Sequence, residues 1–208
     1  MNKNIDAIIF DLGGVLINID YQLTEDAFVA LGLSNFSEVY SQMQQSDLFD
    51  RYEKGKISSF HFINQLLDKL PKGTSANQVV HAWNKMLLDF PASRLEKLND
   101  LKKHYRLFLL SNTNEIHIDA FRRIFSAAFG DAKIEDYFEQ VYFSSEIGMR
   151  KPDAEVFEFV CNKNGLNPAK TMFIDDSPQH VEGAKSVGIE AVLLGKNQEV
   201  FSLPFFLA

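Results

Sequence analysis

The chain has 208 residues, 46% of them hydrophobic, with 19 phenylalanines, a composition that predicts a well-packed globule and excludes a disordered chain. This length allows one large domain, or a domain with an insertion, and a sizeable core. The net charge of -7 argues against a nucleic-acid partner, because such binding needs a basic face. If this acidic protein binds an anion, it must do so at one local site, through a few hydrogen-bond donors directed at the anion or through a metal ion.

Several features bear on the compartment and on partners. The single cysteine, Cys161, permits no internal disulfide, which fits a reducing compartment, and its apolar neighbours indicate a small core residue. The N-terminal apolar run is interrupted by acids, unlike a signal peptide, and no stretch approaches the roughly 20 apolar residues that span a bilayer. We therefore expect a cytoplasmic protein without a membrane partner. The apolar tail, residues 201–208, is expected to pack on the body or contact a second subunit, and no feature sets the oligomeric state.

The stretch that organises the chain is residues 7–15, in which an apolar run meets Asp11 and two glycines follow. A short unbroken apolar run is typical of a strand covered on both faces in a parallel sheet. The Asp11 carboxylate would then emerge at the strand's carboxyl end, where Gly13 and Gly14 leave the backbone open to a ligand or a metal. The alternative is an acid that caps a strand-to-helix turn.

The middle of the chain is helical by pattern, and strand signals are absent from it. Helices are predicted over residues 47–54 and 60–70, after a capping box of Ser75 and Gln78, and after Pro91. We therefore expect two domains: a helical-bundle cap domain, residues 18–90, and an α/β core domain, residues 1–17 and 91–208.

After the helical region the pattern alternates between strands and helices. Strands are predicted over residues 106–110, 141–143, 171–174 and 190–194, with helices between them. Together with the opening strand, this alternation predicts an α/β fold with a parallel sheet and helices on both faces.

Polar residues stand where these strands end or in the loops that follow. They are Asp11, Ser111 with Asn112, Lys151, and the pair Asp175 and Asp176. The carboxyl ends of parallel strands share one edge of an open sheet, so we expect these side chains to converge there. Taken singly, each has an ordinary alternative: a helix cap, a solvated loop cation or a turn. A common site explains all of them together.

Such a cluster has a definite chemical use. Three carboxylates gathered at one place repel one another, and a hard cation such as Mg2+ with oxygen ligands relieves that repulsion. Asp11 is then placed to attack the phosphorus of a phosphate ester and form an aspartyl-phosphate, which water hydrolyses. The substrate predicted on this basis is a small phosphorylated metabolite.

The other polar groups suit the phosphoryl oxygens of that substrate. Lys151 supplies a compact positive charge. Ser111, Asn112 and the backbone N–H groups of the turn at Leu12 and Gly13 supply hydrogen bonds. These residues are therefore the predicted substrate-binding groups.

Four segments resemble the four motifs of the haloacid dehalogenase-like (HAD) hydrolase superfamily. They are residues 10–16, 110–114, 148–153, and 173–177 with Gly183 and Ala184. The resemblance covers the whole chain and implies a Rossmann-like core in which the helical insertion is a small cap. Within this subfamily the sequence is most similar to sugar-phosphate phosphatases of the alpha-glucose-1-phosphate phosphatase type.

The resemblance also implies roles for the acidic residues. Asp11 would be the nucleophile, and Mg2+ would bind Asp11, the Gly13 carbonyl and Asp176. Asp175 would be an accessory ligand, or it would contact the ligands without binding the ion itself. The resemblance also implies that Ser111, Asn112 and Lys151 bind the phosphoryl group.

One position departs from the family pattern. Most phosphatases of the superfamily carry a second aspartate two residues after the nucleophile, as general acid and base, and Gly13 stands there. Loss of such a group costs about 10²–10⁴ in rate, least where the leaving group departs without a proton, as the hemiacetal oxygen of a sugar 1-phosphate does. We therefore expect sugar 1-phosphates to react faster than sugar 6-phosphates. A cap acid (Asp20, Asp47 or Glu53) is an alternative proton donor.

The missing aspartate leaves two other functions open. Haloacid dehalogenases also lack it and use no metal, but there the pair Asp175 and Asp176 would be costly without a cation. A non-catalytic phosphate-binding regulatory protein is the second alternative, and the presence of Asp11 and Lys151 speaks against it.

Cap residues and histidines complete the candidates. Tyr21, Tyr52 and Glu53 are the cap residues expected near the substrate. The histidines show no metal-ligand spacing, and surface or capping positions are expected for His61, His81, His104 and His117. His180, four residues after Asp176, could face the crevice, and a plain surface position on its helix is the alternative.

Overall fold

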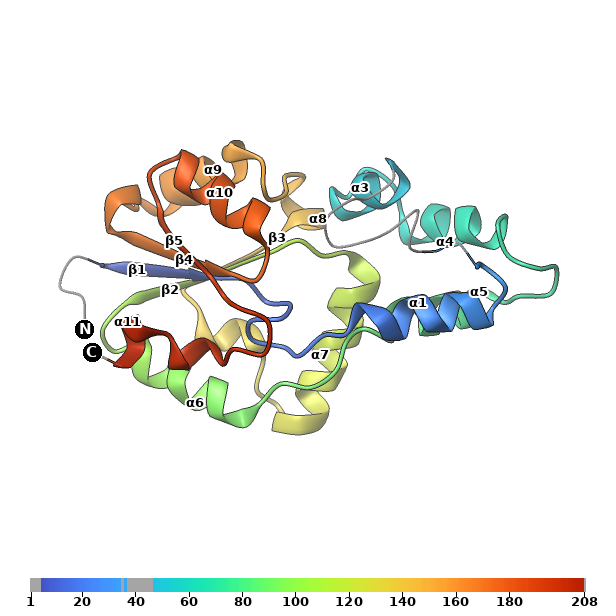
Figure 1. Ribbon diagram of the computed structural model, residues 1–208, viewed down its shortest axis with the longest axis horizontal. Coiled ribbons are helices and arrows are strands. Elements are labelled where there is room, and N and C mark those ends of the chain that lie inside the picture. Colours follow the sequence, from blue (N-terminus) through green and yellow to red (C-terminus); the bar gives the residue numbers. More distant parts are fainter. Residues whose placement is uncertain (1–4, 35, 37–46, 208) are drawn as a thin grey trace.

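A computed structural model describes residues 5–34, 36 and 47–207 of the chain. Its centre is a five-stranded parallel sheet in the order β3-β2-β1-β4-β5, which confirms the predicted α/β fold (Figure 1). The strands are β1 (Ala7–Phe10), β2 (Arg106–Ser111), β3 (Gln140–Phe143), β4 (Thr171–Asp175) and β5 (Glu190–Leu193). The strand that leads into Asp11 is therefore the central one.

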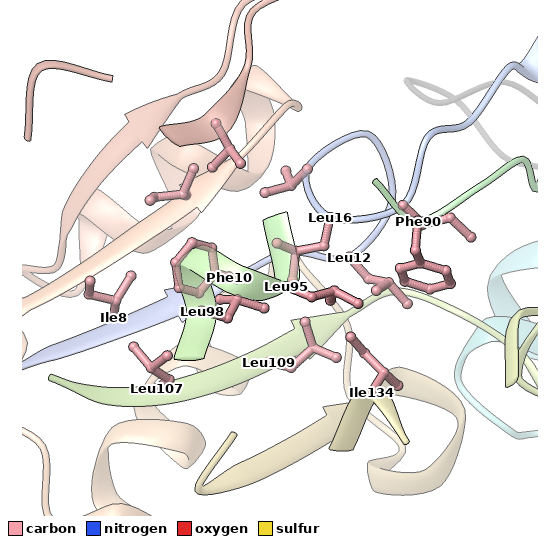
Figure 2. Close-up of a cluster of buried hydrophobic side chains, with 14 of the residues drawn as sticks. Ile8, Phe10, Leu12, Leu16, Phe90, Leu95, Leu98, Leu107, Leu109 and Ile134 are labelled. Carbon is pink, nitrogen blue, oxygen red and sulfur yellow. The ribbon is translucent and has the colours of Figure 1, made fainter. Parts of the chain in front are cut away.

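The apolar run of β1 is explained by burial on both of its faces. Ile8 and Phe10 point into a cluster with Leu107 and Leu109 of β2, which Figure 2 shows. Ala7 and Ile9 belong to a second cluster on the opposite face. Because successive side chains of a strand alternate between the faces of its sheet, an unbroken apolar run fills both clusters.

Helices cover both faces of the sheet (Figure 1). Side chains of α6 (Ala92–Leu101) and α7 (Glu115–Phe129) join the first cluster, and those of α9 (Ala154–Asn164) and α10 (Pro178–Ser186) join the second. The remaining core elements are short: α8 (Ser144–Ile147), α11 (Pro204–Leu207), and the 3-10 helices η1 (Ile134–Tyr137), η2 (Pro168–Lys170) and η3 (Val200–Ser202). The sequence patterns do not reveal α8 or the 3-10 helices.

Between β1 and β2 the chain forms a group of helices at one end of the molecule (Figure 1). They are α1 (Tyr21–Ala30), α3 (Asp47–Glu53), α4 (Ser59–Leu67) and α5 (Ala76–Asn84). Ser58 caps α4, and Ser75 with Gln78 forms the predicted capping box of α5. These helices enclose a third hydrophobic cluster around Trp83. The assignment of residues 18–90 as a cap domain stays a prediction.

Two further expectations concern the apolar surfaces. Phe201, Phe205 and Phe206 of the C-terminal tail pack against the first cluster, as expected for a tail that covers the body. Cys161 is buried among apolar residues of the second cluster, as predicted for a core residue. In the described part of the chain, no helix is both long and apolar enough to cross a membrane.

Candidate active site

The polar residues that follow the strands converge at the carboxyl edge of the sheet. Asp11 follows β1, Ser111 ends β2, and Asp175 ends β4 and precedes Asp176. A pocket at this edge is lined by the predicted residues Asp11, Leu12, Gly13, Ser111, Asn112 and Asp176. The structure thus brings together residues that are up to 165 positions apart in the sequence, because parallel strands end side by side.

Lys151 lies behind Asp11, with its side chain fully buried. Its Nζ donates hydrogen bonds of 2.6 Å to Asp11 Oδ1, 2.6 Å to Asp175 Oδ2 and 2.9 Å to the carbonyl of Leu110. An ammonium group has three N–H donors, and these three bonds use them all. Lys151 is therefore a buried anchor for Asp11 in this structure, and the solvated loop cation of the ordinary alternative does not describe it.

Asp175 is fully buried on the other side of Lys151. Its Oδ1 accepts a 2.8 Å hydrogen bond from the backbone N–H of Ser177, and His180 Nδ1 lies 3.0 Å from the same oxygen. Its Oδ2 accepts from Lys151. Protein groups thus contact both carboxylate oxygens, which favours a role in orienting Lys151.

Asn112 holds the backbone of Lys151 in place. Its Nδ2 donates a 2.8 Å hydrogen bond to the Lys151 carbonyl, and its Oδ1 accepts a 2.9 Å bond from the Lys151 N–H. Both ends of the amide are therefore engaged with the loop. The predicted contact of Asn112 with a phosphoryl group stays a prediction, whereas its positioning of Lys151 is visible in the structure.

Burial and charge shift the pKa values in this cluster. Burial raises the pKa of Asp11, and this effect outweighs the opposing effect of Lys151. Burial also disfavours the charged forms of Asp175 and Lys151, but the attraction of Lys151 to Asp11 and to Asp175 prevails. The pKa of Asp175 accordingly falls to about 2, with a contribution from His180, and that of Lys151 is raised.

The donor set around Asp11 suits a hard divalent cation. Asp11, Asp175 and Asp176 each place a carboxylate oxygen within 4.8 Å of the others, and such a group of acids is one that a divalent cation stabilises. Gly14 has a positive φ of 73°, and a Cβ there would lie 2.5 Å from Asp176 Oδ2. A glycine is thus required for Asp176 to approach the turn, where carboxylate and backbone oxygens of the kind that bind Mg2+ are gathered.

The helical insertion between β1 and β2 contributes part of the pocket wall. Tyr21 and Glu53 line the pocket, as predicted for cap residues near the substrate. Tyr52 does not: its hydroxyl lies 2.8 Å from Ser59 Oγ and accepts a bond from the Ile116 N–H. Of the three acids considered as proton donors, Glu53 is the one that lines the pocket. Asp20 is instead the N-cap of α1, and Asp47 pairs with Arg51.

The surface or capping position predicted for His117 is wrong. Its ring is buried and stacks on Trp83 with centroids 4.6 Å apart, because α5 packs against the start of α7. Burial lowers the pKa of His117 to about 4.

His180 is buried and lines the pocket, so it faces the crevice and does not take the plain surface position. Its Nε2 has no hydrogen-bond partner among the described residues.

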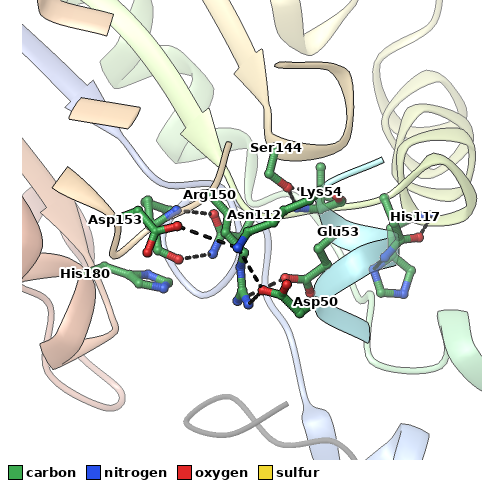
Figure 3. Close-up of polar contacts among 12 residues, drawn as sticks. Asp50, Glu53, Lys54, Asn112, His117, Ser144, Arg150, Asp153 and His180 are labelled. Carbon is green, nitrogen blue, oxygen red and sulfur yellow. Dashed lines mark hydrogen bonds and ion pairs between the residues drawn. The ribbon is translucent and has the colours of Figure 1, made fainter. Parts of the chain in front are cut away.

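Sequence reasoning missed Arg150, which precedes Lys151 and also lines the pocket. Its guanidinium reaches across to α3, where Nη1 donates to Asp50 Oδ1 at 3.0 Å and Nη2 lies 3.1 Å from Glu53 Oε2 (Figure 3). An arginine next to a predicted substrate-binding lysine was the available signal. Its partners are about 100 positions earlier in the chain, so the sequence alone could not pair them.

The fold and the pocket define an α/β protein with an acidic ligand site at the carboxyl edge of its sheet. A family model for haloacid dehalogenase-like hydrolases matches residues 5–188. The chain therefore belongs to this family.

Individual relatives are similar over nearly the whole chain. A D-ribitol-5-phosphate phosphatase of Bacteroides thetaiotaomicron is 30% identical over 184 residues, which cover 88% of each protein. A phosphorylated carbohydrates phosphatase of Thermotoga maritima is 26% identical and is matched over 83% of its length. The crystal structure of a HAD family enzyme from B. thetaiotaomicron, in complex with magnesium and inorganic phosphate, superimposes with a TM-score of 0.86 at 35% identity, covering 96% of this chain and 99% of that one.

Proposed function

We propose that this HAD-family phosphatase hydrolyses the phosphate monoester of a small sugar or polyol, with Mg2+ as its cofactor. The observation that carries the proposal is the placement of Asp11 in the pocket, with Lys151 Nζ at 2.6 Å and the Asp176 carboxylate close by. The named activities of the relatives, on ribitol 5-phosphate and on phosphorylated carbohydrates, support the substrate class.

Three groups would hold the Mg2+ ion: Asp11, the Gly13 carbonyl and Asp176. The ion supplies positive charge that offsets the repulsion between an anionic nucleophile and a phosphate ester. Asp175 would act behind these ligands, because protein groups already contact both of its oxygens. The chelating groups come from the ends of two neighbouring strands, β1 and β4, so the sheet itself sets their spacing.

The chemical steps follow from the position of Asp11. A carboxylate oxygen attacks phosphorus, the bond from phosphorus to the substrate oxygen breaks, and an aspartyl-phosphate forms on Asp11. Water then attacks that phosphorus, releases inorganic phosphate and restores the carboxylate. Lys151 orients Asp11 through its hydrogen bond, while Ser111 and the N–H groups at Leu12 and Gly13 are the proposed contacts of the phosphoryl oxygens.

The finer choice of substrate depends on Gly13, which offers no side chain to protonate the leaving oxygen. The leaving-group argument favours sugar 1-phosphates, whose hemiacetal oxygen departs more easily than a primary alcohol. The similarity to a ribitol-5-phosphate phosphatase favours a phosphate on a primary carbon. Glucose 1-phosphate, glucose 6-phosphate and D-ribitol 5-phosphate are therefore the substrates that need to be compared.

The first test is a steady-state assay of these three esters and of p-nitrophenyl phosphate with Mg2+. We expect activity that EDTA abolishes and added Mg2+ restores, and a loss of at least 10³-fold in kcat for Asp11→Asn, because an amide is a poor nucleophile. Faster hydrolysis of glucose 6-phosphate than of the 1-phosphate would refute the leaving-group argument.

The same assay separates the two alternative functions. Removal of chloride from 2-chloropropionate in the presence of EDTA would identify a dehalogenase, and we expect none. Binding of inorganic phosphate without turnover of any ester would identify a non-catalytic protein. Either result would contradict the proposed phosphatase.

A further inference from the structure

Glu53 is a buried acid in the wall of the pocket opposite the sheet. It is the last residue of α3, and only 5% of its surface is exposed. The other described residues that the helical insertion contributes to the pocket are uncharged: Ile19, Tyr21, Met86 and Leu87. Glu53 is therefore the charge that this wall presents to whatever part of a substrate lies beyond its phosphoryl group.

Arg150 fixes the position of this carboxylate. Its Nη2 lies 3.1 Å from Glu53 Oε2, and its side chain is 13% exposed. A buried carboxylate is costly unless it is paired, so this ion pair offsets part of the cost of burying Glu53 and orients its carboxylate. Arg150 directly precedes Lys151, which donates a hydrogen bond to Asp11, so the loop ties the position of Glu53 to that of the nucleophile.

We propose that Glu53 is a specificity-determining residue that accepts hydrogen bonds from substrate hydroxyls near the phosphate, and that Arg150 is its positioning residue. This inference rests on the proposed phosphatase function. A carboxylate has about four lone-pair sites, so the ion pair with Arg150 is compatible with further hydrogen bonds from substrate hydroxyls. The same negative charge disfavours substrates that carry a second anionic group, such as a carboxylate or a second phosphate.

A purely structural reading of the pair makes a different prediction. Asp50 lies on the same helix, accepts from the same arginine at 3.0 Å and also pairs with Lys54, but it does not line the pocket. If Glu53 only joined the cap to the core, removing either acid would affect all substrates alike. Asp50→Asn is therefore the matched control for Glu53→Gln, since each removes one anionic partner of Arg150.

The test measures kcat/KM for three probes with Mg2+: the fastest sugar or polyol phosphate of the panel above, p-nitrophenyl phosphate, which has no hydroxyl, and 3-phosphoglycerate, which carries a carboxylate. In Glu53→Gln we expect the ratio of the polyhydroxyl substrate to the aryl phosphate to fall at least tenfold. We expect the ratio of 3-phosphoglycerate to the polyhydroxyl substrate to rise at least tenfold. In Asp50→Asn both ratios should stay within about twofold, because Asp50 does not line the pocket and its loss acts on every substrate equally.

Arg150→Lys provides the second measurement and keeps a positive charge beside Glu53. We expect it to raise the KM of the polyhydroxyl substrate more than that of the aryl phosphate, because a lysine holds the carboxylate less rigidly.

Equal changes of the ratios in the Glu53 and Asp50 variants, or unchanged ratios in a folded Glu53→Gln, would overturn the inference. Should Glu53→Gln not fold, Glu53→Asp must show the same direction in both ratios. A wild-type protein inactive on every phosphate ester would instead refute the proposed function, and the inference with it.

Discussion

At the scale of single residues, the acidic site depends on what is absent as much as on what is present. Gly14 occupies a left-handed conformation, and Asp176 Oδ2 lies 2.5 Å from where a Cβ would be, too close for the two atoms to coexist. A side chain there would push away the carboxylate proposed to bind Mg2+. The role of Gly14 thus lies in the space it leaves and in the backbone conformation it allows.

We expect Gly14→Ala to weaken Mg2+ binding at least tenfold, measured by calorimetry, because the new methyl group displaces Asp176. Gly165→Ala is the matched control, since Gly165 has a similar φ of 62° with nothing within 4 Å of the added Cβ. Backbone strain costs each variant roughly 1–2 kcal/mol of stability. Equal Mg2+ affinity in the two variants would show that Asp176 is not held against this turn for the metal.

At the scale of elements, α5 and α7 are joined by a buried polar contact. His117 Nε2 lies 3.1 Å from the carbonyl of Trp83, and its Nδ1 lies 3.2 Å from Asn114 Nδ2. A carbonyl only accepts, so Nε2 carries the proton and Nδ1 accepts from the amide. This arrangement requires a neutral imidazole and links α5 to α7 beside the pocket.

The protein should lose stability as the pH falls from about 6.5 to about 4. The pKa of His117 is lowered from 6.5 to about 4, so in this range the unfolded chain binds a proton that the folded chain refuses. The full effect is about 3 kcal/mol. Denaturant titrations at several pH values should show it, and His117→Gln should remove most of this slope. The exposed His104 gives the control, His104→Gln, which should retain it.

At the scale of the whole molecule, the pocket is assembled from the ends of strands and from α3, so a ligand there stabilises distant parts together. We expect Mg2+ at 100 times its Kd to raise Tm by about 5–10 °C, from about 2.7 kcal/mol of binding energy and 2–4 °C per kcal/mol at this size. Differential scanning fluorimetry with and without Mg2+ measures the shift. In Asp176→Asn the shift should largely disappear, and an undiminished shift would place the ion elsewhere.

The local patterns of this chain predicted the core well where one segment carries its own signal. The apolar run before Asp11, the capping box at Ser75 and the alternation after residue 103 gave the strands, the helix start and the parallel sheet. The convergence of Asp11 and Asp176 also followed, since strand ends of a parallel sheet share an edge.

The failures share one cause. His117, Arg150 and the engagement of Asn112 with the Lys151 backbone depend on partners from other elements, and no local pattern marks such a partner. A histidine beside a helix start is equally compatible with solvent and with a packed interface. Which of these holds depends on how α5 packs on α7.

By itself, the sequence determined where the strands and the longer helices follow one another along the chain, and with them the layered α/β class. It also determined that acids and donors gather at one sheet edge. The reason is that periodicity, caps and strand ends are local features of a chain. Only the tertiary structure decided that Lys151 is an interior anchor for Asp11 and that Glu53 meets Arg150 at the pocket wall. Those facts depend on side-chain burial and on distances between elements far apart in the sequence, which arise when the cap and the sheet pack against each other.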